Sequence, residues 1–401
     1  MQLTAEQRQT VAEYANAADL GNTFKVFNEK SAKYQDMLLS LRSCKSLGPS
    51  DAIHIAVDHI LDLYQEIKQG KETNAPIVDP ERILTTRLIE FIESLPRAYE
   101  FRVTLPSFPN WGAFELELAP GIRLIGQPEP EPPLLNGLLA LTISSQIQPT
   151  AKRGVSLVFE MRGFASSNAD SPVPTDAIAL LKLTSFLLVT QNVLLGIWNS
   201  PLATASVIDR LTGKSEDISL PEGLARHIGG LQPNTEALQV FDAPAGASIA
   251  QLLTAPKRAA ATDAERVEVL STLLKPIARV LNLRKGAAFR PLEAAIEWHQ
   301  DSHFTQDQTI AYLAACIGLE ALFGEPDMNE MSKRLQDRYA FLLGKSREDR
   351  ARLAHEYEQV LRIRGHLVHA RVKRLSTRDA KSLATARKML KDSILHELQR
   401  L

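Results

Sequence analysis

The chain has 401 residues, of which 44% are apolar and 23% charged, with 22 prolines and 20 glycines. This composition is typical of a folded protein of roughly two or three domains, and it excludes disordered, collagen-like and coiled-coil proteins. The only two cysteines, Cys44 and Cys316, lie far apart in the sequence. A disulfide framework and a zinc site of clustered cysteines are therefore excluded as well.

The formal net charge is −1, with 46 Lys and Arg against 47 Asp and Glu, and this balance alone predicts no polyanionic partner. The charges are unevenly distributed, because residues 333–401 hold 18 basic and 8 acidic side chains. The first residues contain no basic run followed by an apolar segment, so no secretory signal is predicted there. We expect a cytoplasmic protein whose C-terminal region is basic.

The predicted fold class is α+β, beginning with a helical N-terminal region over residues 1–97. Four amphipathic stretches between residues 5 and 95 have helical period. Ser50 and Asp79 are predicted N-caps, and Pro80 suits the first turn of the helix that follows Asp79.

Residues 98–254 are predicted to form a central domain with an antiparallel sheet. Short β-favouring runs separated by Pro and Gly clusters begin near Tyr99, and they read EFRVTL, AFELEL, GIRLIG, LLALTISSQI and GVSLVFEMRGF. The apolar stretch from Ala177 to Trp198 is long enough to span a bilayer but contains Lys182 and five other polar residues. It predicts a buried helix, alone or followed by a strand, and no membrane contact. A hairpin is predicted over 206–220 and a last short strand over 236–242.

Residues 255–401 return to helical period and are predicted to form an all-α domain. Pro276 is expected to interrupt the first of its helices, over 262–282.

Several motifs in the chain lack an essential residue. Two Gly-Lys-Ser triplets, at Gly213 and Gly344, have no glycine five positions upstream and cannot form a phosphate-binding loop. His299 and His303 are four apart on a predicted helix, but Gln300 replaces the glutamate of a zinc protease motif. The pair is expected to be solvated, and neither a metal ion nor another cofactor is predicted.

The helix predicted over 348–370 carries an arginine within its apolar stripe. The stripe consists of Leu353, Tyr357, Val360, Leu361, Leu367 and Val368, and a rotation of about 100° per residue places Arg364 in its middle. A guanidinium facing a core or an interface needs a partner, because an unpaired buried charge costs several kcal/mol. Glu320 borders the apolar stripe of an upstream helix, formed by Ile310, Leu313, Ala314, Ile317 and Ala321, and is a candidate partner.

The opposite face of the same helix collects four groups able to carry positive charge, namely His355, Arg362, His366 and His369. Such a face suits phosphate binding, and histidines also transfer protons near neutral pH. The simplest alternative is a solvated polar face, with Arg364 in a purely structural pair.

The stretch from Phe289 to Leu401 resembles the HEPN superfamily, in particular its Apea-like branch. The resemblance is carried by Gly318-Leu319-Glu320-Ala321-Leu322-Phe323, which matches an Ala-Leu-Glu type motif, and by Arg364-Gly365-His366-Leu367-Val368-His369, which matches an Arg-x4-His motif. Two positions depart from the family's pattern, since Gly365 replaces a polar residue and Ala370 replaces a glycine.

The resemblance implies a helical bundle that acts as a metal-independent endoribonuclease leaving 2′,3′-cyclic phosphate ends. His369 would be the general acid or base and Arg364 would stabilise charge on the phosphate, while His366 and Arg362 would hold the RNA backbone. On an ideal helix Arg364 and His369 lie roughly 140° apart. A homodimer that joins two motifs, or a helix bent or unwound at Gly365, would resolve this.

Three functions remain open. The first is a phage-defence or abortive-infection toxin, whose N-terminal and central regions sense a trigger and which an activator or antitoxin controls. The second is a catalytically silent HEPN domain that binds RNA or a partner protein. The third is an interaction scaffold whose basic residues serve solubility.

Overall fold

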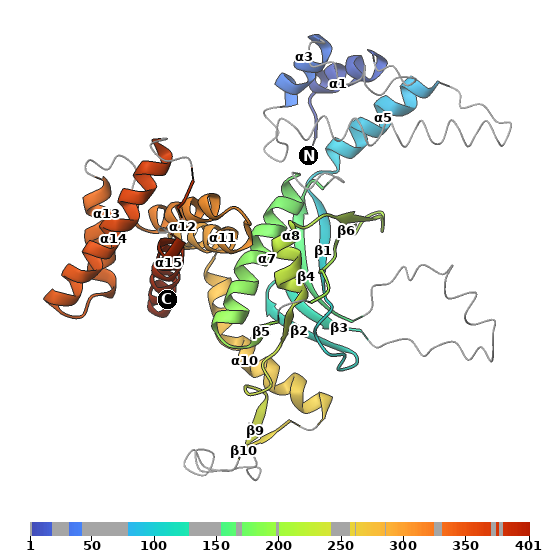
Figure 1. Cartoon of the computed structure of the whole chain (residues 1–401). Coiled ribbons are helices and arrows are strands. Elements are labelled where there is room, and N and C mark those ends of the chain that lie inside the picture. The colour runs from blue at the N-terminus through green and yellow to red at the C-terminus, as the bar shows by residue number, and fades with distance from the viewer. Residues whose placement is uncertain are drawn as a thin grey trace. The chain divides into compact units, whose positions relative to one another are not determined.

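The computed structural model describes residues 2–17, 32–41, 79–127, 154–165, 171–197, 200–241, 257–260, 262–284, 286–324, 331–369, 374–376 and 380–401. The predicted α+β class is confirmed, with N-terminal helices, a central six-stranded antiparallel sheet and a C-terminal helical region (Figure 1). Contacts divide the chain into two compact units, each assembled from three segments. One unit contains residues 1–102, 159–178 and 205–219, and the other contains the remainder.

The described N-terminal helices are α1 (Ala5–Ala17), α3 (Ala32–Leu41) and α5 (Pro80–Glu93). The predicted start of α5 is confirmed, since the Asp79 side chain accepts a hydrogen bond from the Arg82 backbone N–H and Pro80 occupies the first turn. Arg8 on α1 forms an ion pair with Glu93 on α5 at 2.7 Å. The predicted N-cap Ser50 and the helix expected after it lie outside the described residues.

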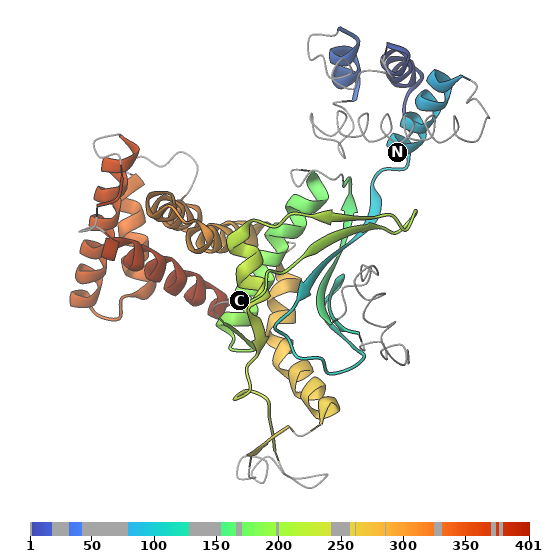
Figure 2. The same ribbon diagram turned by 45° about the vertical axis from the view of Figure 1, so that its right-hand side comes forward.

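The strands of the sheet follow the order β2-β3-β4-β1-β6-β7 (Figures 1 and 2). Their bounds are β1 Arg97–Leu105, β2 Phe114–Ala119, β3 Ile122–Gly126, β4 Val155–Gly163, β6 Ala205–Asp209 and β7 Ser215–Ile218. Four of the five predicted β runs are confirmed as β1 to β4, and β6 and β7 form the predicted antiparallel hairpin. The fifth run, LLALTISSQI, lies outside the described residues.

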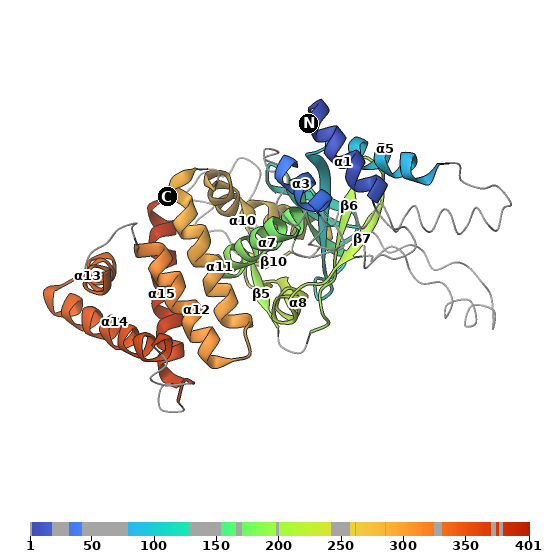
Figure 3. The same cartoon turned by 90° about the horizontal axis from the view of Figure 1, so that it is seen from above.

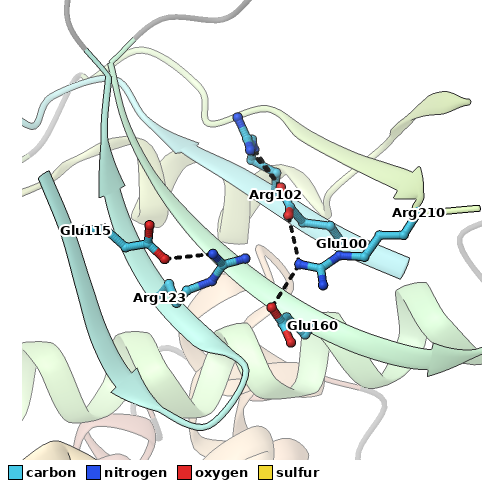
Figure 4. A network of polar contacts seen from close by, with 6 residues as sticks. All are labelled: Glu100, Arg102, Glu115, Arg123, Glu160 and Arg210. Carbon is cyan, nitrogen blue, oxygen red and sulfur yellow. Dashed lines mark hydrogen bonds and ion pairs between the residues drawn. The ribbon is translucent and has the colours of Figure 1, made fainter. Parts of the chain in front are cut away.

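Along β1, buried side chains alternate with partly exposed ones, which point to the opposite face of the sheet. That partly exposed face carries charged residues of both signs. Arg210 contacts Glu100 on β1 at 3.3 Å and Glu160 on β4 at 2.8 Å (Figure 4). On β2 and β3, Glu115 and Arg123 pair at 2.7 Å. Opposite charges on neighbouring strands stabilise the pairing by a few tenths of a kcal/mol each.

The apolar stretch forms helix α7 (Pro172–Thr190) followed by strand β5 (Leu194–Gly196), which confirms the prediction of a helix followed by a strand. By length and composition α7 would suffice to cross a membrane, but 67% of its most apolar window is buried inside the protein. Its Lys182 forms ion pairs with Glu297 at 3.3 Å and Asp301 at 2.7 Å. The helix thus has the burial of a core helix.

Between residues 220 and 260 one helix was missed and one prediction is wrong. Helix α8 (Glu222–Gly229) was not predicted, because its eight residues give too short a periodic pattern. The strand β9 (Gln239–Phe241) is not the last one, since β10 (Lys257–Ala259) pairs with it in antiparallel register. The helical region therefore begins only after β10. With three residues, β10 is too short to show the alternation of apolar and polar residues that identifies a strand. A further two-stranded sheet pairs β5 with β8 (Leu231–Pro233).

Pro276 does not interrupt helix α10 (Asp263–Leu283), contrary to the prediction. The buried side chains Leu270, Leu274, Ile277 and Leu281 continue across it on one face. Pro276 and Thr272 are both exposed, so the Thr272 carbonyl that loses its helical partner faces solvent. Packing of the apolar face and hydration of this carbonyl explain why the helix continues.

Replacing Pro276 by alanine should raise the free energy of unfolding by about 2 kcal/mol. Restoring the helical hydrogen bond is worth up to about 3 kcal/mol, and the greater freedom of the unfolded chain offsets up to about 1 kcal/mol. Urea denaturation measures the change, and Lys275→Ala, at an exposed position beside it, serves as control. A loss of stability in Pro276→Ala would contradict this account of the helix.

The remaining helices are α11 (Arg290–Phe304), α12 (Gln308–Phe323), α13 (Met331–Leu343), α14 (Arg347–Val368) and α15 (Ala380–Arg400). A single turn of 3-10 helix, Ala287–Phe289, leads into α11. Helices α11, α12 and α15 pack against one another, and α13 packs along α14 (Figure 3). Helix α14 contacts α12, and this contact positions the predicted site residues.

Candidate functional site

Helix α14 begins after Ser346, whose side chain accepts a hydrogen bond from the Asp349 backbone N–H. Its predicted apolar stripe is buried only in the first part of the helix, where Leu353, Tyr357 and Val360 are at most 7% exposed. Leu367 is half-buried and Val368 is 50% exposed. The last turn of the stripe therefore does not face the core.

Helix α12 buries a different face from the one predicted. Its buried residues include Ala311, Ala315, Cys316, Gly318 and Leu319. Of the predicted stripe, Ala314 is buried, whereas Leu313, Ile317 and Ala321 are half-buried and Ile310 is 57% exposed. The helix is apolar on nearly all sides, so its period did not identify the buried face.

The predicted ion pair between α12 and α14 is confirmed. The Arg364 Nε atom lies 3.1 Å from Oε1 of Glu320, and an Arg364 terminal nitrogen lies 3.2 Å from Oε2. Two contacts to the two carboxylate oxygens fix the plane of the guanidinium. The Arg364 and Glu320 side chains remain 32% and 23% exposed, so the pair is half-buried and accessible to a ligand.

Buried polar side chains lie beneath this pair. The Tyr312 hydroxyl of α12 donates a hydrogen bond of 2.8 Å to the Val360 carbonyl of α14. Burial, reinforced by Glu320, raises the pKa of the Cys316 thiol to about 12. Burial likewise raises the pKa of Tyr357, whose hydroxyl has no hydrogen-bond partner among the described residues. Cys316 and Tyr357 are therefore neutral at neutral pH and supply no nucleophile or base.

The other predicted site residues on α14 lie apart from the pair. Arg362 is exposed and donates to the Gln359 side chain at 2.8 Å, and His366 is half-buried in the last turn. His369 is exposed directly after the helix, and its backbone N–H donates to the Gly365 carbonyl at 3.1 Å. The structure brings Glu320 and Arg364 together, whereas His369 leaves the helix roughly 140° further round.

Helix α14 is not unwound at Gly365, so an unwound turn does not explain the separation. The helix continues to Val368, and a Cβ atom added at Gly365 would meet no other atom within 4 Å. The position therefore tolerates a side chain without steric conflict. Ala370, the second departure from the HEPN pattern, lies outside the described residues.

A groove of about 640 Å³ lies between α13, α14 and α15. Its charged side chains are already paired, since Arg352 contacts Asp349 and Glu356 at 2.6 Å, and Lys388 contacts Asp392. Neither Arg364 nor His369 lines this groove. It is a separate feature, and its lining holds one more carboxylate than cation.

The expectation that His299 and His303 form a solvated pair is wrong for His299. That ring is 6% exposed, packs edge-on against Phe186 and lies 4.8 Å from the exposed His303 ring between centroids. Within the described ranges, no three His, Cys, Asp or Glu side chains are placed to hold a metal ion. Helix period alone could not show that α7 covers this face.

Comparison of the chain with protein-family models, curated proteins and solved structures gives no match.

Proposed function

We propose that the protein is a metal-independent endoribonuclease of HEPN type that acts on RNA as a homodimer. The observation that supports the proposal is the Glu320–Arg364 pair between the two helices that carry the HEPN-like motifs. Nearly a third of the arginine side chain remains accessible, and an exposed histidine follows five positions later. An accessible guanidinium held in a fixed plane suits the recognition of a phosphodiester.

The proposed reaction is attack of a ribose 2′-oxygen on the adjacent phosphorus. His369 removes the 2′-hydroxyl proton as the new O–P bond forms, and the bond to the 5′-oxygen breaks. Arg364 stabilises the charge that builds on the phosphate, and Glu320 orients the guanidinium. The products are a 2′,3′-cyclic phosphate and a 5′-hydroxyl, which takes up a proton as it leaves. DNA lacks the attacking hydroxyl and is not cleaved.

The proposed dimer supplies the geometry that one helix lacks. Arg364 of one copy and His369 of the other would meet across a two-fold axis, as the resemblance implies. Helix α12 offers an apolar surface for this contact, formed by the exposed Ile310 and the half-buried Leu313, Ile317 and Ala321. Arg362 and His366 would then hold the RNA backbone beside the composite site.

The proposed biological role is that of a phage-defence or abortive-infection toxin in the cytoplasm. The N-terminal helices and the central sheet would respond to a trigger, with an activator or antitoxin controlling cleavage. This role follows from the resemblance, and it accounts for a chain in which the HEPN-like region is only a part.

Incubation of the purified full chain with total RNA in excess EDTA tests the reaction. Wild type should produce fragments with 2′,3′-cyclic ends, and an RNA with a 2′-deoxy substitution at the cleaved position should stay intact. His369→Ala should abolish cleavage, whereas His355→Ala should not, because His355 is 69% exposed on an earlier turn of the same helix. Cleavage that persists in His369→Ala, or that needs a metal ion, would refute the assignment.

The dimer is tested separately by the mass of the protein in solution. Wild type should have twice the chain mass at micromolar concentration, and Ile310→Glu should shift it towards one chain, because a charge on the apolar surface opposes its burial. Leu211→Glu is the matched control, since Leu211 is 71% exposed in the β6–β7 turn and is not part of the apolar surface of α12. A wild-type monomer would remove the composite site.

The alternative is a catalytically silent domain that binds RNA or a partner protein. This alternative is favoured by the engagement of Arg364 with both Glu320 oxygens and by Gly365 in place of a polar residue. A silent RNA binder would lose affinity for RNA steeply as the salt concentration rises. Weakening the hold of Glu320 on Arg364, in Glu320→Gln, would not produce RNA cleavage in such a protein. Retention of RNA without any cleavage would support this reading over the nuclease.

A further inference from the structure

A second group of basic side chains lies between α8, α11 and α15, and we name it the histidine–arginine cluster. It consists of His227 on α8, His299 and His303 on α11, and Arg387 and Lys391 on α15. The His299 and His303 rings are 4.8 Å apart, the His227 ring lies 5.2 Å from Phe304, and Arg387 donates to the Ser302 carbonyl. All five residues belong to one compact unit.

Nitrogen atoms in this cluster lack hydrogen-bond partners in the described structure. They are both ring nitrogens of His299, Nε2 of His227 and Nε of Arg387. His299 is 6% exposed, so no bulk water compensates for its missing partners. A buried polar atom without a partner is costly, and such atoms are rare in folded proteins. Several of them in one cluster indicate a group that completes their hydrogen bonds.

The charge of the cluster is not neutralised from within. The carboxylates on α11 nearest in sequence, Glu297 and Asp301, form ion pairs with Lys182 of α7. On α8, Glu222 pairs with Arg226 at 2.7 Å. Burial first, and then His303, Lys391 and Arg387, lower the pKa of His299 to about 3. The surroundings therefore disfavour further positive charge and favour a negative one.

Helix capping explains only part of the cluster. Arg387 and His303 lie near the C-terminal end of α11, where free carbonyls and the helix dipole attract cations. The dipole does not provide acceptors for the buried nitrogens of His299 and His227. A negatively charged ligand that accepts hydrogen bonds from several directions would supply partners for the buried nitrogens and would also compensate the positive charge of the cluster.

We propose that the histidine–arginine cluster binds a phosphate group, either free or carried by a nucleotide. His303 and Lys391 are exposed and Arg387 is half-buried, so the ligand can approach between α11 and α15. Phosphate oxygens accept charge-assisted hydrogen bonds from Arg387, Lys391 and the histidines. Burial lowers the pKa of His303 to about 4, and a phosphate in contact with this ring raises that pKa because it stabilises the protonated form. This site is independent of the proposed ribonuclease site on α12 and α14.

Isothermal titration of the full chain with inorganic phosphate, AMP and adenosine tests the proposal. Inorganic phosphate or AMP should bind and adenosine should not, and which of the two binds more tightly identifies the source of the phosphate. Absence of phosphate and AMP binding, or equal binding of adenosine and AMP, would overturn the proposal.

Variants locate the site. Lys391→Gln and Arg387→Gln should each weaken phosphate binding about tenfold. Lys388→Gln, on the same helix and 77% exposed, is the matched control and should bind as wild type does. Arg387 also contacts α11, so Arg387→Gln could fail to fold. In that case phosphate binding by Lys391→Gln, at an exposed position, decides whether the location is right. Binding unchanged in Lys391→Gln would refute the location. RNA cleavage by the Arg364 site should persist in Lys391→Gln, which separates the two proposals.

Discussion

Arg364→Ala should slow RNA cleavage by roughly two to three orders of magnitude, the usual cost of removing a group that stabilises transition-state charge. The measurement is the single-turnover rate at saturating RNA, where binding no longer limits the reaction. Arg364→Lys should recover little of this rate, because an ammonium cannot reproduce the two contacts that fix the guanidinium against Glu320. The structural cost should be small, about 1 kcal/mol, since the pair is only half-buried.

Arg352→Ala is the matched control for this prediction. Arg352 lies on the same helix, also contacts two carboxylates and is 58% exposed, but it is paired near the groove between α13, α14 and α15. Its replacement should leave the cleavage rate unchanged. Equal losses in the two variants would show that the helix needs its ion pairs for folding and would remove Arg364 from the mechanism.

In phosphate-free buffer, His227 and His299 together should lower the free energy of unfolding by roughly 4 kcal/mol when the pH falls from 7 to 5. Burial lowers the pKa of His227 to about 4 and, with His303, Lys391 and Arg387, that of His299 to about 3, against 6.5 in the unfolded chain. Between pH 6.5 and these values the unfolded chain binds protons that the folded chain rejects. Stability is therefore lost as the pH falls, by roughly 2 kcal/mol for each histidine at pH 5.

Urea denaturation at several pH values measures this loss. His299→Gln should flatten the dependence between pH 5 and 7, whereas His355→Gln, at a 69% exposed position, should leave it as in wild type. The pKa values of Glu93, Asp307 and Asp349 are lowered by hydrogen bonds, so these groups lose their contribution only at lower pH. Equal stability at pH 5 and pH 7 would contradict the buried, neutral state of His227 and His299.

The elements that sequence reasoning identified are those with strong local patterns. Alternating residues in β1 and the Asp79-Pro80 cap of α5 encode their structures locally, and both predictions are confirmed. Short elements such as α8 and β10 have too few residues for a period, and β10 depends on its pairing with β9. Pro276 shows the opposite case, in which tertiary packing outweighs a strong local signal.

The candidate site was predictable where a charge had to be compensated. Arg364 within an apolar stripe required an acidic partner, and Glu320 is that partner. The histidine–arginine cluster was not predictable, because it joins residues of three helices that are distant in sequence. The buried face of α12 was also not predictable, since a helix that is apolar on all sides has no period to read.

The hydrogen bond from Tyr312 to the Val360 carbonyl has a mechanical consequence. In an α-helix this carbonyl also accepts from the backbone N–H four residues later, which belongs to Arg364. One oxygen atom thus anchors both a neighbouring helix and the arginine's own peptide group. Sliding or rotating α14 along α12 breaks this shared attachment, so a signal that repositions the guanidinium by moving α14 must first release the tyrosine.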